Sequence, residues 1–257
     1  MRSSVCSIVT CLVWLVPLAS ADEVATPRTP VLIELFTSEG CSSCPEAEFY
    51  VSKLLRTQPL EHVRIIAVSQ HVDYWDSPEW KDPFSSAEHT ERQRRYARKF
   101  ETEVYTPQLV IDGREHYVGS LRREVLSSIY RAGRREKAEI DVLARWAENG
   151  SIDLSVSIGD LPDGTGELEL WTAVTEDGLI VSVERGENRG RELHHDAVAR
   201  HIDGAGRIQA HETRTLRVDV REGWEKANLR VVAFVQEARS GRIIGVDSVT
   251  LSSEAGR

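Results

Sequence analysis

The feature that most constrains this chain is a pair of cysteines, Cys41 and Cys44, between a strand pattern and a helical pattern. A largely apolar strand pattern runs from Val31 to Phe36 and includes Glu34. A short polar turn follows, and the helical pattern begins directly after the second cysteine. Two thiols with this spacing at the junction of a strand and a helix are typical of a site for thiol–disulfide exchange. We therefore expect the fold to hold two sulfur atoms together at the start of a helix.

Residues 1–21 have the composition of a secretory signal peptide. Arg2 precedes a short apolar stretch, and a small-x-small cleavage site ends at Ala21. The stretch is too short to predict a membrane span. It contains the other two cysteines, Cys6 and Cys11, so a cleaved chain keeps only the pair described above. We expect bacterial export to a secreted or periplasmic location, where oxidising conditions favour a disulfide between close cysteines.

The chain is acidic, with 32 Lys and Arg residues against 41 Asp and Glu residues and a net charge of −9. This balance, without a basic stripe in the sequence, argues against a nucleic-acid-binding surface. No later stretch is apolar enough to span a bilayer, so we expect no membrane span in the mature chain. The length allows one large domain or two ordinary ones, and the oligomeric state stays open.

The hydrophobic pattern predicts an α/β domain over residues 31–138, after a flexible leader at 22–30. The order of strand, helix and strand indicates parallel pairing through a right-handed crossover. Asp112-Gly113 is the two-residue turn of a hairpin. The expected elements are a strand at 31–36, a helix after the cysteines, a strand at 63–68, a helix that begins in a capping box at 85–88, a hairpin at 104–119 and a last helix capped by Ser120.

Residues 139–253 predict an all-β domain, with residues 254–257 as a tail. Turn signals such as Asn149-Gly150 and Asp177-Gly178 separate short segments in which apolar and polar residues alternate. Strands at this spacing are typical of an antiparallel sandwich. We interpret this β-sandwich as an element that binds a partner or stabilises the first domain. The alternating segments begin near Ile152, Leu168, Leu216, Leu229 and Ile243.

A cysteine at a helix N-terminus is more reactive than an ordinary one. Unpaired N–H groups and the positive end of the helix dipole stabilise its thiolate and lower its pKa. We assign Cys41 as the nucleophile and Cys44 as the resolving thiol that attacks a mixed disulfide and releases the product. Glu39, Glu46 and Glu48 place negative charge nearby, so we expect the pKa of Cys41 to be lowered only moderately.

The order of the predicted elements around the cysteines resembles the thioredoxin fold over residues 31–137. In that family the residue before a cis-proline faces the dithiol and binds the extended substrate chain through its backbone. Thr106 and Pro107 match that position, directly before a hairpin strand. The resemblance implies a cis peptide bond at this proline and a role for both residues in binding substrate.

The run from Thr37 to Pro45 is similar to a family of secreted bacterial thioredoxin-like proteins that is catalogued only as a domain of unknown function. The runs from Val72 to Asp76, from Trp80 to Phe84 and from Glu184 to Asn188 are similar to that family too. This resemblance covers most of the mature chain. It implies the fold and export, but no established reaction.

Thioredoxins also carry a buried acid on the first strand that assists proton transfer, and Glu34 matches it by resemblance. A buried carboxylate near two thiols would have a raised pKa and act as a general base toward Cys44. The alternative is that Glu34 lies at a sheet edge and faces water. The chain departs from ordinary thioredoxins in the dipeptide Ser42-Ser43, which replaces Gly-Pro, and in one extra residue before the first cysteine.

His71 and Trp75 follow the second predicted strand, at the carboxyl edge of the sheet. Ligand sites of open α/β sheets tend to lie at this edge. We expect these two side chains to line a substrate groove beside Cys41. The alternative is that they anchor the following loop as ordinary packing residues.

Two sets of residues raise the question of a metal site. Cys41, Cys44 and His71 form one set, and the run from His194 to Asp196 forms the other. A Cys-x-x-Cys with a distant His can hold copper or zinc. No second cysteine pair or His-x-x-x-His motif accompanies either set, so we assign no metal ligand and no cofactor.

These observations predict an exported protein that exchanges thiols and disulfides through Cys41 and Cys44. Its expected partner is a protein or small-molecule thiol or disulfide. Two alternatives stay open: a binding protein in which the disulfide is a static brace, and a Cys/His metal carrier. The direction of electron flow is not determined, because a reduction potential depends on the relative stability of the two redox forms.

Overall fold

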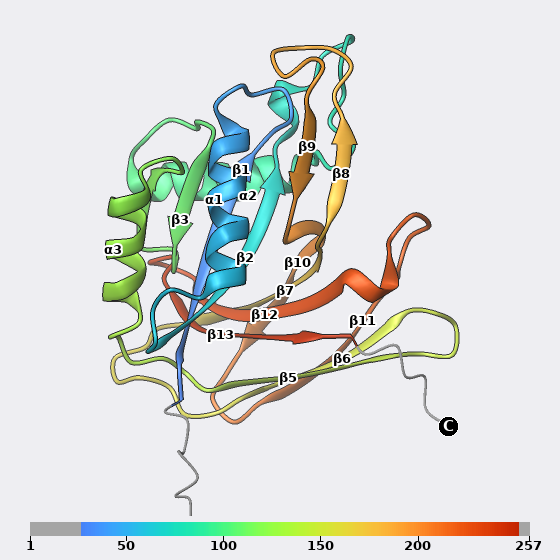
Figure 1. The fold of residues 1–257 in the computed structure, drawn as a ribbon. Coiled ribbons are helices and arrows are strands. Elements are labelled where there is room, and N and C mark those ends of the chain that lie inside the picture. Colours follow the sequence, from blue (N-terminus) through green and yellow to red (C-terminus); the bar gives the residue numbers. More distant parts are fainter. Residues whose placement is uncertain (1–26, 252–257) are drawn as a thin grey trace, which may run out of the picture.

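The computed structural model describes residues 27–251, so the predicted signal peptide, most of the leader and the predicted tail lie outside the described residues. Within residues 27–251 no helix is both long enough and apolar enough to cross a bilayer. The elements, shown in Figure 1, are β1 (Thr29–Thr37), α1 (Cys44–Thr57), β2 (Val63–His71), η1 (Asp73–Trp75), α2 (Ala87–Phe100), β3 (Gln108–Ile111), β4 (Glu115–Val118), α3 (Arg122–Ala132), β5 (Ile140–Trp146), β6 (Ile152–Ile158), β7 (Leu168–Glu176), β8 (Leu179–Ser182), β9 (Glu192–His195), β10 (Val198–Ile208), β11 (Thr213–Val218), η2 (Lys226–Asn228), β12 (Leu229–Glu237) and β13 (Ile243–Thr250).

The fold is a mixed α/β arrangement around one sheet of eight strands in the order β13-β12-β7-β10-β2-β1-β3-β4. β1 lies inside this sheet, parallel to β2 and antiparallel to β3. The parallel pairing predicted from the strand–helix–strand order is therefore confirmed. All residues of β1 from Val31 onward are buried, because both faces of an inner strand are covered.

The helices cover opposite faces of the sheet. Alternate residues of β1, among them Ile33 and Leu35, pack against α1 and α3 in one apolar core. Phe36 points to the other face, where it contacts Tyr96 of α2 with ring centroids 6.0 Å apart. Figure 1 shows α1 and α3 in front of β1 and β3, with α2 behind them.

The sheet continues across the boundary that the sequence pattern placed near residue 138. β10 lies parallel to β2 through the pair Val198 and Ser69, and the Ser69 N–H donates to the Ala197 carbonyl at 2.7 Å. β7, β12 and β13 extend the sheet from there. The first and last parts of the chain therefore share one hydrogen-bonded layer.

A second layer covers the far end of that sheet. β5, β6 and β11 form a three-stranded sheet, and β6 alternates strictly between buried and half-buried residues. Its buried side chains, Ile152, Leu154 and Val156, pack with residues of β7 and β12 in one core. This alternation is the pattern expected of a strand with one face toward a core.

Local signals set several element boundaries. The Ser86 side chain accepts a hydrogen bond from the Glu88 N–H and caps α2, so the helix begins within the predicted run 85–88, one residue later than a capping box from Ser85 to Glu88 requires. Asp112 and Gly113 have φ values of 47° and 58°, the left-handed region that a two-residue hairpin turn requires. The prediction that Ser120 caps the last helix is wrong. Leu121 occupies the cap position of α3 without a side-chain hydrogen bond, because the helix begins one residue later.

Candidate functional site

Cys41 and Cys44 form a disulfide at the start of α1, with their Cα atoms 5.5 Å apart. Cys44 is the first residue of the helix, and Pro45 follows in the first turn, where its missing N–H is not needed. The sulfur of Cys41 lies 3.4 Å from the Ser43 hydroxyl. Cys41 is 2 % exposed and Cys44 is fully buried, so neighbouring residues cover the bond.

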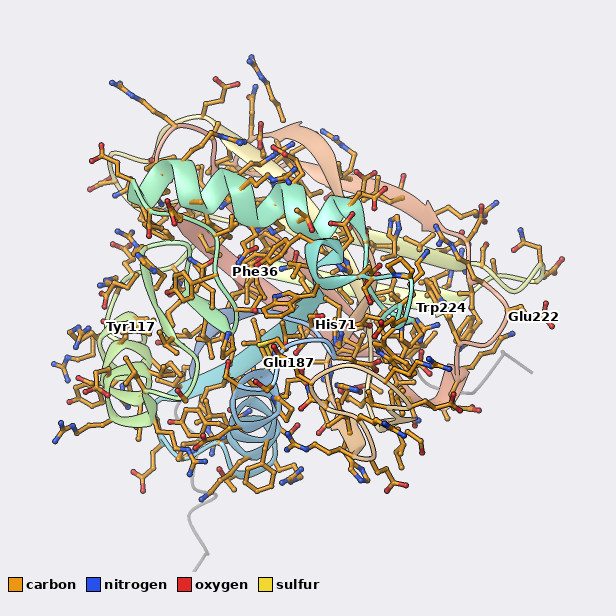
Figure 2. The ribbon with its side chains drawn as sticks, turned by 90° about the horizontal axis from the view of Figure 1, so that it is seen from above. Phe36, His71, Tyr117, Glu187, Glu222 and Trp224 are labelled. Carbon is orange, nitrogen blue, oxygen red and sulfur yellow. A yellow bond between two sulfur atoms is a disulfide. The ribbon has the colours of Figure 1, made fainter. Side chains whose placement is uncertain are left out.

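Part of that cover is the loop between β8 and β9, residues 183–191. The buried Asn188 side chain donates to the carbonyl oxygens of Glu39 at 2.7 Å and Cys41 at 3.0 Å. The Ser42 N–H donates to Glu187 Oε2 at 3.0 Å. Figure 2 views this end of the molecule from above and shows Glu187 beside the end of α1. The loop therefore holds the backbone on both sides of Cys41.

A second side of the cysteine loop faces Trp75 and Thr106. The Thr106–Pro107 peptide bond is cis, as the resemblance implied. The Trp75 indole N–H donates to the Thr106 hydroxyl at 2.8 Å. A Cβ on Gly40 would lie 3.2 Å from the Trp75 Cβ, so a glycine there lets the loop pack closely. Trp75 is 36 % exposed, which leaves an aromatic surface next to the cysteines.

Glu34 is buried on an inner strand, so the sheet-edge alternative is wrong. Its carboxylate is paired with Arg92 of α2 through contacts of 2.5 and 3.0 Å. Gln70 donates to Glu34 at 2.9 Å, and the Tyr96 hydroxyl donates to the same carboxylate. Burial and the charge of Glu34 raise the pKa of Tyr96 well above its ordinary value, so its hydroxyl keeps its proton.

The other face of β1 and β2 carries a buried cluster of imidazoles and carboxylates. We call it the imidazole cluster and define it as Glu39, Glu48, His71, Asp82 and His195. His71 Nδ1 lies 2.7 Å from Asp82 Oδ2, and His195 Nδ1 lies 2.5 Å from Glu48 Oε2. His195 Nε2 lies 3.3 Å from Glu39 Oε1. The two imidazole rings meet edge to face, with centroids 5.1 Å apart.

The cluster fixes the charge of several of its members. Burial lowers the pKa of His195, but hydrogen bonds and charges from Glu39 and Glu48 outweigh burial and raise that pKa to about 10. Burial raises the pKa of Glu48, and the hydrogen bond and charge of His195 reverse this and lower it. The pKa of Asp82 is lowered in the same way, because the charge and hydrogen bond of His71 outweigh burial.

The predicted site residues are therefore divided among three places. Trp75 packs against Gly40 of the cysteine loop and donates a hydrogen bond to Thr106, the residue before Pro107. His71 is buried in the imidazole cluster and does not line an exposed groove. Glu34 lies on the opposite face of β1, among the side chains of α2.

Neither of the two residue sets that raised a metal site is assembled as that set, although one histidine of each, His71 and His195, meets in the imidazole cluster. Each cysteine is bonded to the other, and His71 binds Asp82. His194 is an exposed neighbour of Glu192, whereas His195 is buried. Alternation along β9 separates these two histidines, since neighbouring strand residues point to opposite faces.

Sequence reasoning missed most of the imidazole cluster. Glu48 follows Cys44 by four residues, a spacing that places both on one helix face and was a usable signal. Asp82 and Asn188 lie inside runs that carried the family resemblance. The run from His194 to Asp196 drew attention to His195, but the sequence did not indicate the partners of His195 and Arg92, which lie 147 and 58 residues away in the chain.

The chain is similar to two solved structures over most of its length. Protein AGR_C_4864 from Agrobacterium tumefaciens has 24 % sequence identity, covers 91 % of this chain and 98 % of its own, and gives a TM-score of 0.66. HBP35 of Porphyromonas gingivalis has 15 % identity, covers 91 % of this chain and 79 % of its own, and gives a TM-score of 0.60. At these identities the likeness concerns the fold alone.

A search of curated proteins found no match. A family model described as a protein of unknown function (DUF1223) matches residues 32–236. This range includes the disulfide, the Trp75–Thr106 contact and the whole imidazole cluster. The chain therefore belongs to the DUF1223 family of proteins of unknown function.

Proposed function

We propose that this protein is an exported thiol–disulfide exchange protein that acts through Cys41 and Cys44. In this proposal residues 31–138 are a thioredoxin-like domain, residues 139–253 are a β-sandwich joined to it, and residues 1–21 are a cleaved signal peptide. The observation that carries the proposal is one arrangement. The disulfide lies at the start of α1, and Trp75 packs against Gly40 in the loop before it. The Trp75 indole also forms a hydrogen bond to Thr106, the residue before the cis-proline.

The helix start supports the chemistry of the reduced form. Backbone N–H groups of the first turn and the helix dipole stabilise a thiolate at this end. The Cys41 thiolate attacks a substrate disulfide, forms a bond to one substrate sulfur and releases the other as a thiolate. The Cys44 thiolate then attacks the Cys41 sulfur, which restores the Cys41–Cys44 bond and releases the second substrate thiol. The protein loses two electrons and the substrate gains them, and the reverse sequence oxidises a dithiol.

The surface beside the disulfide supports a peptide or small thiol as substrate. Trp75 offers an apolar face, and Thr106 offers backbone groups next to the cis peptide bond. An extended peptide chain could pair with these backbone groups while its disulfide approaches Cys41. His71 and Glu34 have no part in this proposal, because both are enclosed by other side chains.

One observation favours a second candidate, a binding protein with a structural disulfide. Cys41 is 2 % exposed, and Asn188 holds the carbonyl of the same residue. A thiol–disulfide exchange protein needs access to the attacking sulfur. In the exchange proposal, the loop at residues 183–191 must move away from Cys41 before substrate can reach it.

The experiment that separates the two functions is equilibration of the purified protein with glutathione redox buffers, followed by quantification of free thiols. We expect a reduction potential between about −120 and −270 mV, the range of exchange proteins. A potential below about −300 mV with slow exchange would establish a structural disulfide instead.

Single-cysteine variants give a matched second test. Cys44→Ser keeps the proposed nucleophile but lacks the thiol that resolves the mixed disulfide, so this variant should accumulate a mixed disulfide with a thiol peptide. Cys41→Ser removes the nucleophile and should accumulate much less of the mixed disulfide. Equal trapping by both variants would contradict the assigned roles.

A further inference from the structure

Three metal-ligating side chains converge in the imidazole cluster. Glu48 of α1, His71 at the end of β2 and His195 at the end of β9 each offer one ligand atom, and these atoms lie within 4.8 Å of one another. The three residues are 5 %, 0 % and 2 % exposed, respectively. Figure 2 places His71 near the middle of the molecule.

Two buried ring nitrogens in this group, His71 Nε2 and His195 Nε2, form no hydrogen bond to a described residue. The other nitrogen of His71, Nδ1, faces Asp82 Oδ2 at 2.7 Å. In the neutral tautomer with the proton on Nδ1, which faces the carboxylate, Nε2 carries the free electron pair. Metal-binding histidines have this arrangement, in which the carboxylate also fixes the ring orientation.

His195 is held in a similar way. Its Nδ1 faces Glu48, and its Nε2 lies 3.3 Å from Glu39 Oε1. Glu39 is itself fixed, because the Trp80 indole N–H donates to its other oxygen at 3.0 Å. A metal on the Nδ1 side therefore leaves Glu39 as the carboxylate that orients the ring from the Nε2 side.

The charges of the cluster also favour a cation. It contains three buried carboxylates: Glu39, Glu48 and Asp82. Within residues 27–251 their ion-pair partners are the two imidazoles, and no Lys or Arg side chain pairs with them. Buried negative charge that is not fully matched is costly.

A triad of Glu39, His195 and Glu48 is an alternative reason for the cluster. It gives His195 Nδ1 a hydrogen bond to Glu48 and His195 Nε2 an ion-pair contact of 3.3 Å with Glu39. It leaves His71 Nε2 without a partner among the described residues. A bound metal accounts for both histidines.

We propose that Glu48, His71 and His195 bind a divalent transition metal, with zinc as the ion that this ligand set fits. Zinc accepts imidazole nitrogen and carboxylate oxygen at about 2.0–2.2 Å. Asp82 and Glu39 orient the two histidines without binding the metal. Three protein ligands leave a fourth position for water. Since His195 and Glu48 are 147 residues apart in the chain, the site forms only as the chain folds.

The test measures zinc in the purified protein after stripping with a chelator, incubation with zinc chloride and extensive dialysis. We expect about one zinc per chain, because the cluster supplies one set of three ligands. His71→Gln and His195→Gln should each weaken zinc binding at least about tenfold, the loss typical when a metal site is disturbed. His194→Gln is the matched control, because this neighbouring side chain is exposed and should leave zinc binding unchanged.

Two further measurements keep the outcome decisive if a variant fails to fold. Cobalt in place of zinc should give the visible absorption of a tetrahedral site in the unaltered protein. Zinc should also raise its melting temperature. Absence of stoichiometric zinc in the unaltered protein, or equal zinc in the His71, His195 and His194 variants, would overturn the proposal. Loss of zinc in Cys41→Ser/Cys44→Ser but not in His71→Gln would move the metal to the cysteines and would also overturn it.

Discussion

Two buried carboxylate sites lie on opposite faces of the same pair of strands, β1 and β2. On one face Glu34 is paired with the guanidinium of Arg92 and receives hydrogen bonds from Gln70 and Tyr96. On the other face the ion-pair partners of the imidazole cluster's carboxylates are histidines alone among the described residues. Gln70 and His71 are adjacent in β2 and point to opposite faces, one to each site.

The difference shows how the choice of cation decides what a buried acid can do. Arg92 is always charged, and its fork matches a carboxylate, so the Glu34 site is complete. An imidazole can carry a proton or release it and bind a metal instead. The Glu34 site therefore serves the fold, whereas the imidazole cluster retains a free donor atom at His71 Nε2.

The largest expected effect comes from breaking the complete site. Arg92→Met leaves the Glu34 carboxylate buried without its cation and should lower the free energy of unfolding by about 3–5 kcal/mol. Chemical denaturation followed by circular dichroism measures this loss. Arg98→Met is the matched control, since Arg98 forms an exposed ion pair with Glu91 and should cost about 1 kcal/mol or less. Equal losses would refute the distinction between the two arginines.

A smaller effect sharpens the role of the imidazole cluster. Asp82→Asn keeps an acceptor oxygen but weakens the carboxylate that orients His71. We expect zinc affinity to fall about 10–100-fold, as for other residues that orient a metal-binding histidine. Competition with a colorimetric chelator measures the change. Asp203→Asn, at an exposed carboxylate, should leave the affinity unchanged, and a comparable fall there would count against the role of Asp82.

Asn188 connects the imidazole cluster with the disulfide, because its amide binds the carbonyls of Glu39 and Cys41. Asn188→Ala removes these two hydrogen bonds and a third that Arg191 donates to the Asn188 side-chain oxygen, and it should cost about 1–2 kcal/mol. It should also speed reduction of the disulfide by dithiothreitol, since the covering loop is held less firmly. Asn149→Ala, in a turn far along the chain, is the control for a general loss of stability. An unchanged reduction rate would show that this loop does not limit access to Cys41.

The smallest effect concerns a carboxylate at the surface. Glu115 pairs with Arg131 and Arg135 at 2.6 and 3.1 Å. Burial raises its pKa, but hydrogen bonds from Ser128, Arg131 and neighbouring groups outweigh burial and lower it to about 2. A folded pKa below the unfolded value of about 4.5 stabilises the protein above that pH. This stability is lost as the pH falls from about 4.5 toward 2.

Glu115→Gln should remove that part of the pH dependence. The effect should be at most about 1 kcal/mol, because solvent screens a partly exposed pair. Urea denaturation at several pH values between about 2 and 6 measures it. A pH profile identical to that of the unaltered protein would mean that Glu115 contributes no linked proton.

Several parts of the fold followed from neighbouring residues alone. The β1–α1–β2 order, the capped start of α2 and the left-handed turn at Asp112 and Gly113 were all predicted, because each depends on short-range pattern and turn chemistry. The short strands β8 and β9 were not predicted. Each has only four residues, too few for a clear alternation.

The sequence by itself determined that two cysteines stand where a strand passes into a helix, and the disulfide joins those two residues. It did not determine the partner of any buried acid. Glu34 meets Arg92 across 58 residues of chain, and Glu48 meets His195 across 147. Only the tertiary structure decided these pairs, because the joining of β10 to β2 and the packing of α2 bring distant side chains together. Local propensity describes the elements, whereas the charge and chemistry of a buried site depend on which elements meet.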